Sequence, residues 1–203
     1  MSTILPPTLN PWLIPPVPVR RFTVDEYHRM MHNGILAAGD PCELLDGWIV
    51  PKMTRSPLHG LALGFAEDEI ERRLPTGWFR RSQSAVTTTE SEPEPDLAVV
   101  RGRRRDYNTQ HPTPANTGLV VEIADSSLAQ DRGVKGPLYA RAAIPVYWIV
   151  NLVDRTLEVY TDPTGPDPAP GYRQRQDYLA GNLVPLVLDG IEIDRIAVAD
   201  LLP

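Results

Sequence analysis

The chain has 203 residues, of which 42% are hydrophobic and 23% are charged, as is typical of a globular protein long enough to bury a core. Its formal net charge of −6 argues against a broad basic coat for non-specific nucleic-acid binding, although it leaves room for a local basic patch. The single Cys42 excludes an intrachain disulfide and a cysteine-rich zinc site, and the lack of an apolar run of about 20 residues or of a signal-peptide pattern leads us to expect a cytoplasmic protein with no membrane partner.

The first part of the chain is predicted to be an extended arm followed by a capped helix. Residues 1–21 are rich in proline and lack an amphipathic pattern, so we expect an arm ahead of a single domain over residues 22–203. Thr23 and Glu26 have the spacing of a capping box and predict the start of a helix. Gly34 is a suitable residue to end it.

Strand patterns dominate the rest of the chain. The pair Asp46-Gly47 between two short apolar runs is the strongest hairpin signal in the sequence. A second hairpin is predicted around Asp154-Arg155. The predicted strands occupy residues 42–45, 48–50, 78–87, 95–100, 119–124, 146–150 and 156–160, with short strands between residues 172 and 193.

Two longer helices are predicted between these strands. Residues 57–74 repeat apolar side chains at helical spacing. A second helical segment runs from about residue 125 to 143, and because Pro137 lies inside it, this helix must kink there or restart near Lys135. With a small helix at the end of the chain, the order of elements predicts an α/β fold on the border of α+β, with a central mixed sheet flanked by helices.

Two acidic residues interrupt strands that are otherwise apolar, Asp96 in residues 95–100 and Glu122 in residues 119–124. An ionised carboxylate in a buried strand is costly unless a cation meets it. Two such strands side by side would supply two oxygens to a hard divalent cation. The pattern therefore indicates metal-assisted hydrolysis, and the alternative is that both acids lie at strand ends in water or cap a helix.

A lysine and a third acid are further candidates. Lys135 could orient or deprotonate a water molecule beside metal-bound carboxylates, or stabilise charge on a phosphate. Asp131, Lys135 and Tyr139 are spaced by four and would form one stripe on a continuous helix, the alternative being a solvated face with an ordinary ion pair. Glu43 lies in an apolar strand before a tight turn, where it is either a third acid of the site or an edge-strand charge.

Two acidic segments and several flanking motifs follow one another in a specific order. The acidic segments are Glu94-Pro95-Asp96 and Leu119-Val120-Val121-Glu122-Ile123. The flanking motifs are Glu43-Leu44-Leu45-Asp46-Gly47, Ser56-Pro57-Leu58-His59-Gly60, Asp131-Arg132-Gly133-Val134-Lys135, Tyr139 and Ile144-Pro145-Val146-Tyr147-Trp148-Ile149-Val150. The acidic pair resembles the signatures of the PD-(D/E)XK nuclease superfamily. The whole order, over residues 22–160 with a weaker tail to residue 202, resembles the Uma-type restriction endonuclease family of bacteria.

This resemblance implies a restriction-endonuclease-like core with a phosphodiesterase site that uses Mg²⁺, with Mn²⁺ as a substitute. Asp96 and Glu122 would be metal ligands, and the backbone carbonyl of Ile123 would complete the shell. Glu43 would be an acid contributed from the N-terminal part of the fold. Lys135 would position or activate the attacking water.

The chain departs from the family pattern at a few positions. The superfamily's lysine two residues after the second acid is replaced here by Ala124, and the resemblance implies that it has moved to the following helix, where Lys135 stands. Val146 and Asn151 stand where Glu and Asp are usual, and Trp48 stands where an acid is common. These changes flank the expected site, so they bear on its tuning and its partner contacts.

A basic cluster follows the strand of the first acid, and its arginines are Arg101, Arg103, Arg104 and Arg105. These side chains could hold phosphates beside the metal, because the guanidinium fork suits phosphate oxygens. The alternative is a solvated loop in an arginine-rich chain. His59 precedes a predicted helix and could contact a phosphate or act as a polar cap.

Together these patterns predict a metal-dependent endonuclease that hydrolyses nucleic-acid phosphodiester bonds, with DNA favoured over RNA. A homodimer is expected, because two sites related by a two-fold axis would cut both strands of a duplex. The alternative is a catalytically inactive module of the same fold for DNA binding or protein interaction, which the net negative charge and the residues at Val146 and Asn151 favour.

Overall fold

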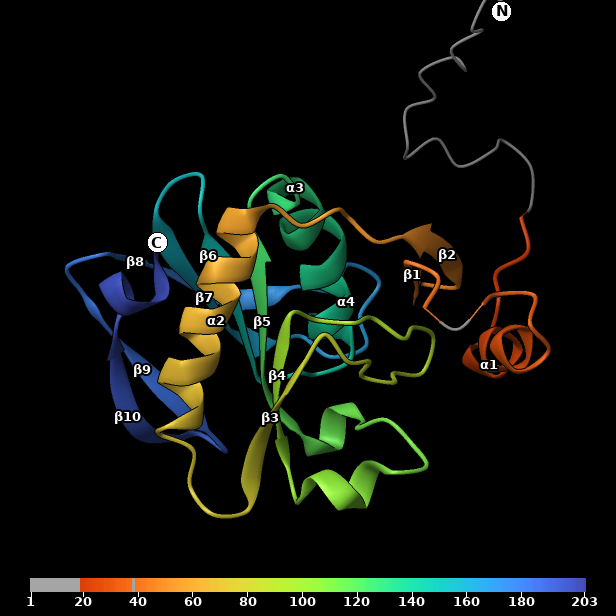
Figure 1. Cartoon of the computed structure of the whole chain (residues 1–203), viewed down its shortest axis with the longest axis horizontal. Helices are drawn as coiled ribbons and strands as arrows, with labels where there is room; N and C mark the ends of the chain where they lie inside the picture. Colours follow the sequence, from red (N-terminus) through yellow and green to blue (C-terminus); the bar gives the residue numbers. More distant parts are fainter. Residues whose placement is uncertain (1–18, 38) are drawn as a thin grey trace, which may run out of the picture.

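A six-stranded sheet forms the centre of the computed structural model, which describes residues 19–37 and 39–203 (Figure 1). Most of the predicted arm over residues 1–21 therefore lies outside the described residues. The strands follow the order β3-β4-β5-β6-β7-β8 across the sheet. They span Trp78–Ser82 (β3), Leu97–Arg101 (β4), Thr117–Ala124 (β5), Val146–Asn151 (β6), Thr156–Pro163 (β7) and Tyr172–Leu179 (β8).

The sheet is mixed. Strand β5 pairs in parallel with β6, whereas the other neighbouring strands pair antiparallel. A parallel pair needs a crossover connection, and a run of helical turns between β5 and β6 provides it. The predicted central mixed sheet flanked by helices is confirmed, and the predominance of antiparallel pairs makes the fold α+β.

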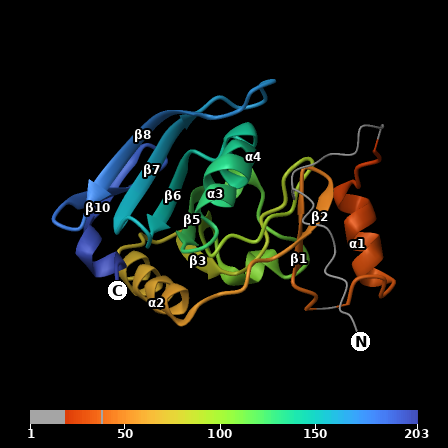
Figure 2. The ribbon, with the colours of Figure 1, turned by 90° about the horizontal axis from the view of Figure 1, so that it is seen from above.

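Helices and two small ribbons surround the sheet (Figure 2). None of the described helices is long and apolar enough to cross a lipid bilayer. The ribbons pair Cys42–Leu45 (β1) with Trp48–Pro51 (β2), and Leu183–Leu188 (β9) with Ile191–Ala197 (β10). The helical elements are α1 (Val24–His32), α2 (Pro57–Glu71), the 3₁₀ turns η1 (Arg104–Tyr107) and η2 (Pro114–Asn116), α3 (Leu128–Gln130), the π-helical turn η3 (Asp131–Lys135), α4 (Gly136–Arg141) and the 3₁₀ turn η4 (Val198–Leu201).

Each face of the sheet has its own apolar core. On β4, Val99 packs in the core that includes α2, η4 and the β9–β10 ribbon, whereas Ala98 packs in the core that includes α4. Figure 2 shows α2 and the α3–α4 connection on opposite faces of the sheet. Because side chains alternate along a strand, Asp96 and Glu122 both belong to the face that α4 covers.

The first helix and hairpin lie to one side of the sheet (Figure 1). The capping box that begins at Thr23 is confirmed. The hairpin turn is confirmed as well, and its two central residues, Asp46 and Gly47, adopt φ angles of 48° and 75°, as a tight turn with two positive φ values requires. The amide of Glu92 donates to the carbonyl of Leu44 at 2.7 Å, which ties this ribbon to the segment before β4.

Two predicted elements differ from the structure. The strand predicted over residues 78–87 ends at Ser82, because Gln83 adopts a φ of 48° and its amide donates to the carbonyl of Asp96 at 3.0 Å. On the partner side, Pro95 has no N–H with which to continue the ladder. The predicted small helix at the end of the chain is a single 3₁₀ turn.

Gly118 of β5 allows the packing between the sheet and the β9–β10 ribbon to be tested. A Cβ atom there would lie 2.7 Å from the ring of Trp78 and 3.0 Å from Leu188, so Gly118→Ala should lower the free energy of unfolding by about 1–3 kcal/mol through overpacking. Gly64→Ala is the matched control, because Gly64 lies inside α2 with nothing within 4 Å of a new Cβ, and alanine should there stabilise by about 0.5–1 kcal/mol. Urea unfolding measures both shifts, and shifts of the same sign would contradict this account.

Candidate functional site

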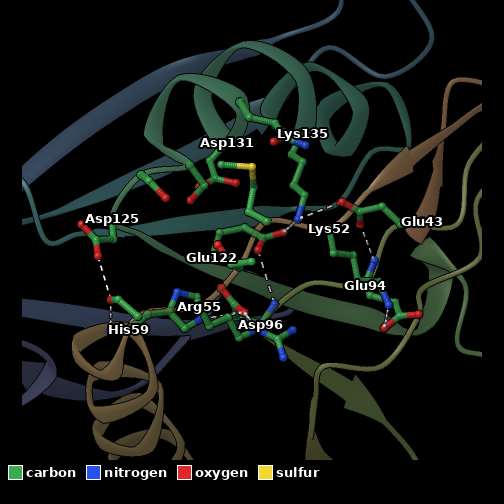
Figure 3. A pocket seen from close by; sticks show the side chains of 16 residues that line it. Glu43, Lys52, Arg55, His59, Glu94, Asp96, Glu122, Asp125, Asp131 and Lys135 are labelled. Carbon is green, nitrogen blue, oxygen red and sulfur yellow. Dashed lines mark hydrogen bonds and ion pairs between the residues drawn. The ribbon is translucent and has the colours of Figure 1, made fainter. Parts of the chain in front are cut away.

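Asp96 and Glu122, the two predicted acids, face each other from neighbouring strands (Figure 3). The register that pairs Leu97 of β4 with Val121 of β5 places Asp96, one residue before β4, opposite Glu122. The amide of Asp96 points to Glu122 Oε2 at 3.4 Å, and the amide of Ile123 donates to Asp96 Oδ2 at 2.9 Å. The structure therefore brings the two predicted carboxylates together, and both are buried.

Lys135 reaches Glu122 from the helical connection between β5 and β6. Its Nζ lies 2.9 Å from Glu122 Oε1 and 3.6 Å from Glu43 Oε1. Tyr139, one turn further on, donates its hydroxyl to the same Glu122 oxygen at 2.8 Å. All four side chains are buried, so the attraction between the ammonium group and the carboxylates is stronger than it would be in water.

The connection that carries Lys135 is not one continuous α-helix. It runs as α3, the π turn η3 and α4, and the amide of Gly136 donates to the carbonyl of Asp131 five residues earlier. Pro137 accounts for this widening, because it has no N–H for the carbonyl of Gly133 and its ring crowds that carbonyl. The predicted restart near Lys135 is confirmed, and Asp131 and Lys135 both line the pocket of the two acids.

Glu43 and His59 also lie at the acids. Glu43 belongs to β1, and its Oε2 accepts a hydrogen bond from the amide of Glu94 at 3.0 Å. His59 lies in the first turn of α2, where its amide donates to Ser56, the N-cap, and its Nε2 lies 3.1 Å from Asp96 Oδ1. His59 is thus a partner of Asp96, and its contact with a phosphate stays a prediction.

The pocket around these groups holds more negative than positive charge (Figure 3). Its acidic members are Glu43, Glu94, Asp96, Glu122, Asp125 and Asp131. Its basic members are Lys52, Arg55, Lys135 and, when protonated, His59. At full ionisation, six carboxylates face three permanently charged side chains, and a bound cation would offset the excess.

The sequence did not assign a role in the site to several residues that line the pocket or contact its acids. They are Lys52, Arg55, Glu94, Asp125, Asp131 and Tyr139. Most of them lie in irregular segments, where no periodicity indicates the direction of a side chain. Lys52 had a signal, because the chain contains only two lysines. Asp131 and Tyr139 were indicated by their spacing of four residues from Lys135.

The two facing acids differ in their affinity for a proton. Burial raises the pKa of the Glu122 carboxyl, and the attraction of the Lys135 ammonium group opposes this effect and favours the ionised form. Burial acts in the same direction on Asp96, but its contacts with His59 and the amide of Ile123 outweigh burial and hold its pKa below the usual value. Asp96 is therefore ionised at neutral pH, and a cation beside Glu122 would favour its ionised form.

Lys135 stays protonated in this setting. Burial alone lowers the pKa of Lys135, but the surrounding carboxylates of Glu122, Glu43 and Asp131 outweigh burial and raise it above the usual value. An ammonium group with a raised pKa is suited to donating hydrogen bonds and poorly suited to removing a proton from water. Burial also raises the pKa of Asp131, to about 6, against the opposing effects of Lys135 and Ser127.

A second ionic network holds η3 on the side of β7. Glu158 of β7 is fully buried and accepts a hydrogen bond from Arg132 of η3 at 3.0 Å. The side-chain amide of Asn151 and the hydroxyl of Tyr160 donate to the same carboxylate at 2.8 and 2.6 Å. Because Arg132 belongs to the same turn as Lys135, this network fixes the turn that carries the lysine.

Asp96 and Glu122 form a donor pair that suits Mg²⁺. This ion is held in proteins by one or two carboxylates, with waters and substrate phosphates in its remaining positions. Over residues 19–37 and 39–203, no group of three or more acidic, histidine or cysteine side chains is arranged to hold a metal ion by itself. The residues therefore fit a cation that keeps most of its water, and the carbonyl of Ile123 as a further ligand stays a prediction.

The predicted basic cluster, which consists of Arg101, Arg103, Arg104 and Arg105, does not lie beside the two acids. Arg101 ends β4, so the length of the strand, roughly 16 Å, separates it from Asp96. Arg101 pairs with Asp189 and lies over the ring of Trp78. Arg101 therefore does not lie beside the acids as expected, because the extended strand β4 separates it from Asp96, and the binding of phosphates by the cluster stays a prediction.

A model of the family described as "Uma2: Putative restriction endonuclease" matches residues 24–198. The chain belongs to the Uma2 family. The matched range contains both acids, Lys135 and every residue that lines the pocket. The resemblance inferred from the motifs is thereby confirmed.

A solved structure shares the fold of this Uma2 chain. It is a crystal structure from Anabaena variabilis, described as "a putative nuclease belonging to DUF820", with a TM-score of 0.68 and 16% sequence identity. The match covers 89% of this chain and 97% of that one. At this identity the likeness establishes the fold alone. No curated protein matches the chain.

The raised pKa of Asp131 predicts a pH-dependent contribution to stability. A pKa of about 6 in the folded state, against 3.8 for the unfolded carboxyl, gives a contribution that is fully present below about pH 4 and is lost as the pH rises through about 6. The stability of the wild type relative to Asp131→Asn should therefore fall by up to about 3 kcal/mol between pH 4 and pH 7. Urea unfolding of both proteins across this range measures the difference, and a constant difference would contradict the assignment.

Proposed function

We propose that this protein hydrolyses phosphodiester bonds of nucleic acids with the help of Mg²⁺ or Mn²⁺, and that DNA is its substrate. The observation that carries the proposal is the buried cluster in which Asp96 and Glu122 stand opposite each other on paired segments, with the Asp96 backbone amide 3.4 Å from Glu122 Oε2 and Lys135 Nζ 2.9 Å from Glu122 Oε1. The family description "Putative restriction endonuclease" and the likeness to a structure described as "a putative nuclease" agree with this class of reaction.

Each residue of the site has a role in this proposal. Asp96 and Glu122 would hold the cation, which when bound polarises the phosphate and lowers the pKa of the attacking water. Lys135 would orient that water and donate a hydrogen bond to the oxygen on which negative charge develops. Glu43 would assist the metal-binding acids and keep the ammonium group of Lys135 in place.

The same pocket also constrains the orientation of its acids before substrate arrives. His59 and the amide of Ile123 contact the two carboxylate oxygens of Asp96. Tyr139 and Lys135 both donate to Glu122. A carboxylate fixed in this way loses little freedom when it binds a cation, which favours binding. A homodimer with two such sites would cut both strands of a duplex.

A catalytically inactive module for DNA binding or protein interaction is the second candidate. Its support is that protein groups already satisfy the carboxylates of Asp96 and Glu122, so the cluster is complete as a structural network. Against it, a buried ionic cluster stabilises a fold no better than apolar side chains of the same volume, so a module without chemistry gains little from it.

Cleavage of plasmid DNA and of labelled DNA and RNA oligonucleotides in Mg²⁺ or Mn²⁺ tests the hydrolase. We expect Asp96→Asn, which keeps the shape of the side chain and removes its charge, to reduce cleavage by about 10²-fold or more, as the loss of one charge-stabilising group does in other enzymes. Glu192→Gln removes an exposed carboxylate on β10 and should leave cleavage unchanged. Undiminished cleavage by Asp96→Asn, with a matching thermal unfolding curve, would refute the role of the acid.

Calorimetric titration with Mg²⁺ and Mn²⁺ separates the two candidates. The hydrolase should release or take up measurable heat on binding, and Asp96→Asn should abolish that heat, because the ion loses one of its two charged ligands. No binding heat in the wild type with either ion, together with no cleavage, would favour the inactive module.

A further inference from the structure

Both lysines of the chain, Lys52 and Lys135, line the acidic pocket. Lys135 is buried and paired with Glu122. Lys52 lies instead in the segment between β2 and α2, and Arg55 follows it three residues later in the same segment. Neither Lys52 nor Arg55 has a role in the chemistry proposed above, although both carry a positive charge at the pocket.

Lys52 and Arg55 lie beside acids of the pocket, Glu94 and Asp96 (Figure 3). Lys52 Nζ lies 2.6 Å from Glu94 Oε2, and these two side chains are 22% and 28% exposed. Arg55 Nε lies 3.8 Å from Asp96 Oδ1, and the Arg55 side chain is 40% exposed. Among the described residues, the long ion pair with Asp96 is the contact that holds the Arg55 guanidinium, which makes no hydrogen bond to them and so retains N–H donors for a ligand.

We propose that Lys52 and Arg55 bind backbone phosphates of the nucleic acid as it enters the pocket, and that phosphate oxygens then replace Glu94 and Asp96 as their partners. This inference rests on the proposed function, because it assigns the substrate-binding side of the same site. A cation bound at Asp96 would weaken the hold of that carboxylate on Arg55, since the positive charges repel each other. The guanidinium would then be released toward the substrate.

The charge of the pocket explains why such residues are needed. Six carboxylates at the site repel a polyanion, so a nucleic acid can approach only where fixed positive charge faces it. Lys52 and Arg55 supply that charge at the exposed edge of the pocket. The planar fork of Arg55 can donate two hydrogen bonds to one phosphate, and Lys52 adds a compact charge beside it.

The arginine cluster after β4 is the rival surface. Its first member, Arg101, lies at the opposite end of β4 from Asp96 and pairs with Asp189. Arg103 pairs with Asp106. Lys52 and Arg55 are paired with acids as well, so what separates the two surfaces is position: Arg101 lies far from the two acids, whereas Lys52 and Arg55 line the pocket itself.

Binding measured as a function of salt tests the inference. The full chain is titrated into fluorescent duplex and single-stranded DNA and RNA in the presence of Ca²⁺, so that the readout is binding. Lys52→Ala and Arg55→Ala should each weaken binding to all sequences and reduce the salt slope on duplex DNA by about 0.9. The ratio of wild-type to variant affinity should therefore fall about three-fold as the salt concentration rises from about 50 to about 200 mM.

Arg195→Ala is the matched control, because Arg195 is an exposed arginine paired with an acid, Glu192, on the β10 strand. It should bind with the affinity and the salt slope of the wild type. The melting temperatures of the variants show whether each chain is folded at the assay temperature.

Glu94, the acid that pairs with Lys52, provides a test in which binding should become tighter. Glu94→Gln frees Lys52 from its ion pair and should tighten binding about two- to five-fold, the range expected for a partly exposed pair. In a chain that already carries Lys52→Ala, the same change should have no such effect, and the double-mutant cycle isolates this coupling from the general loss of negative charge.

The outcomes distinguish this inference from the proposed function. Salt slopes that stay at the wild-type value in Lys52→Ala and Arg55→Ala, while Arg103→Ala and Arg104→Ala reduce them, would place the nucleic acid at the far end of β4 and overturn the inference, even if the protein cleaves DNA. Binding that depends on Lys52 and Arg55 without any cleavage would support the inference and refute hydrolysis. No binding to any of the probes would overturn both.

Discussion

The buried ion pair between Lys135 Nζ and Glu122 Oε1, 2.9 Å apart, is the interaction on which the rest of the site depends. It joins the central strand β5 to the helical connection that crosses the sheet, and both side chains are buried. Removing one partner of a buried pair leaves the other uncompensated, at a cost of about 3–5 kcal/mol. The pair therefore fixes the helical connection against the sheet and also sets the charge of the pocket.

Segments that are distant in sequence meet at this pair. The hairpin contributes Glu43, the entry to β4 contributes Asp96, and α2 contributes His59, each within one or two contacts of Glu122. The result is an excess of carboxylates on one face of the sheet, partly balanced by cations from the segment before α2. Repulsion among buried carboxylates raises the free energy of the folded state, and binding of a cation and a phosphate would lower it again in part.

The sequence was informative where regular structure controls the direction of side chains. The period of two along β4 and β5 was sufficient to put Asp96 and Glu122 on one face, and Pro137 was sufficient to interrupt the following helix. Arg55 could not be found in this way, because it lies in an irregular segment whose path depends on tertiary contacts. Arg101 was misplaced for a different reason: nearness in sequence was taken as nearness in space, although a strand advances about 3.3 Å per residue.

The π turn also sets a limit on how the length of this protein can vary. Each residue of a helix turns the chain by about 100°, so the loss of one residue within η3 would restore an α-helix and rotate everything before it relative to α4 by that amount. Arg132 and Lys135, which now reach Glu158 and Glu122 at the same time, could not then both keep their partners. A deletion within this five-residue turn would therefore break at least one of the two ion pairs, whichever residue is lost, whereas the loop between β7 and β8 carries no such helical phase.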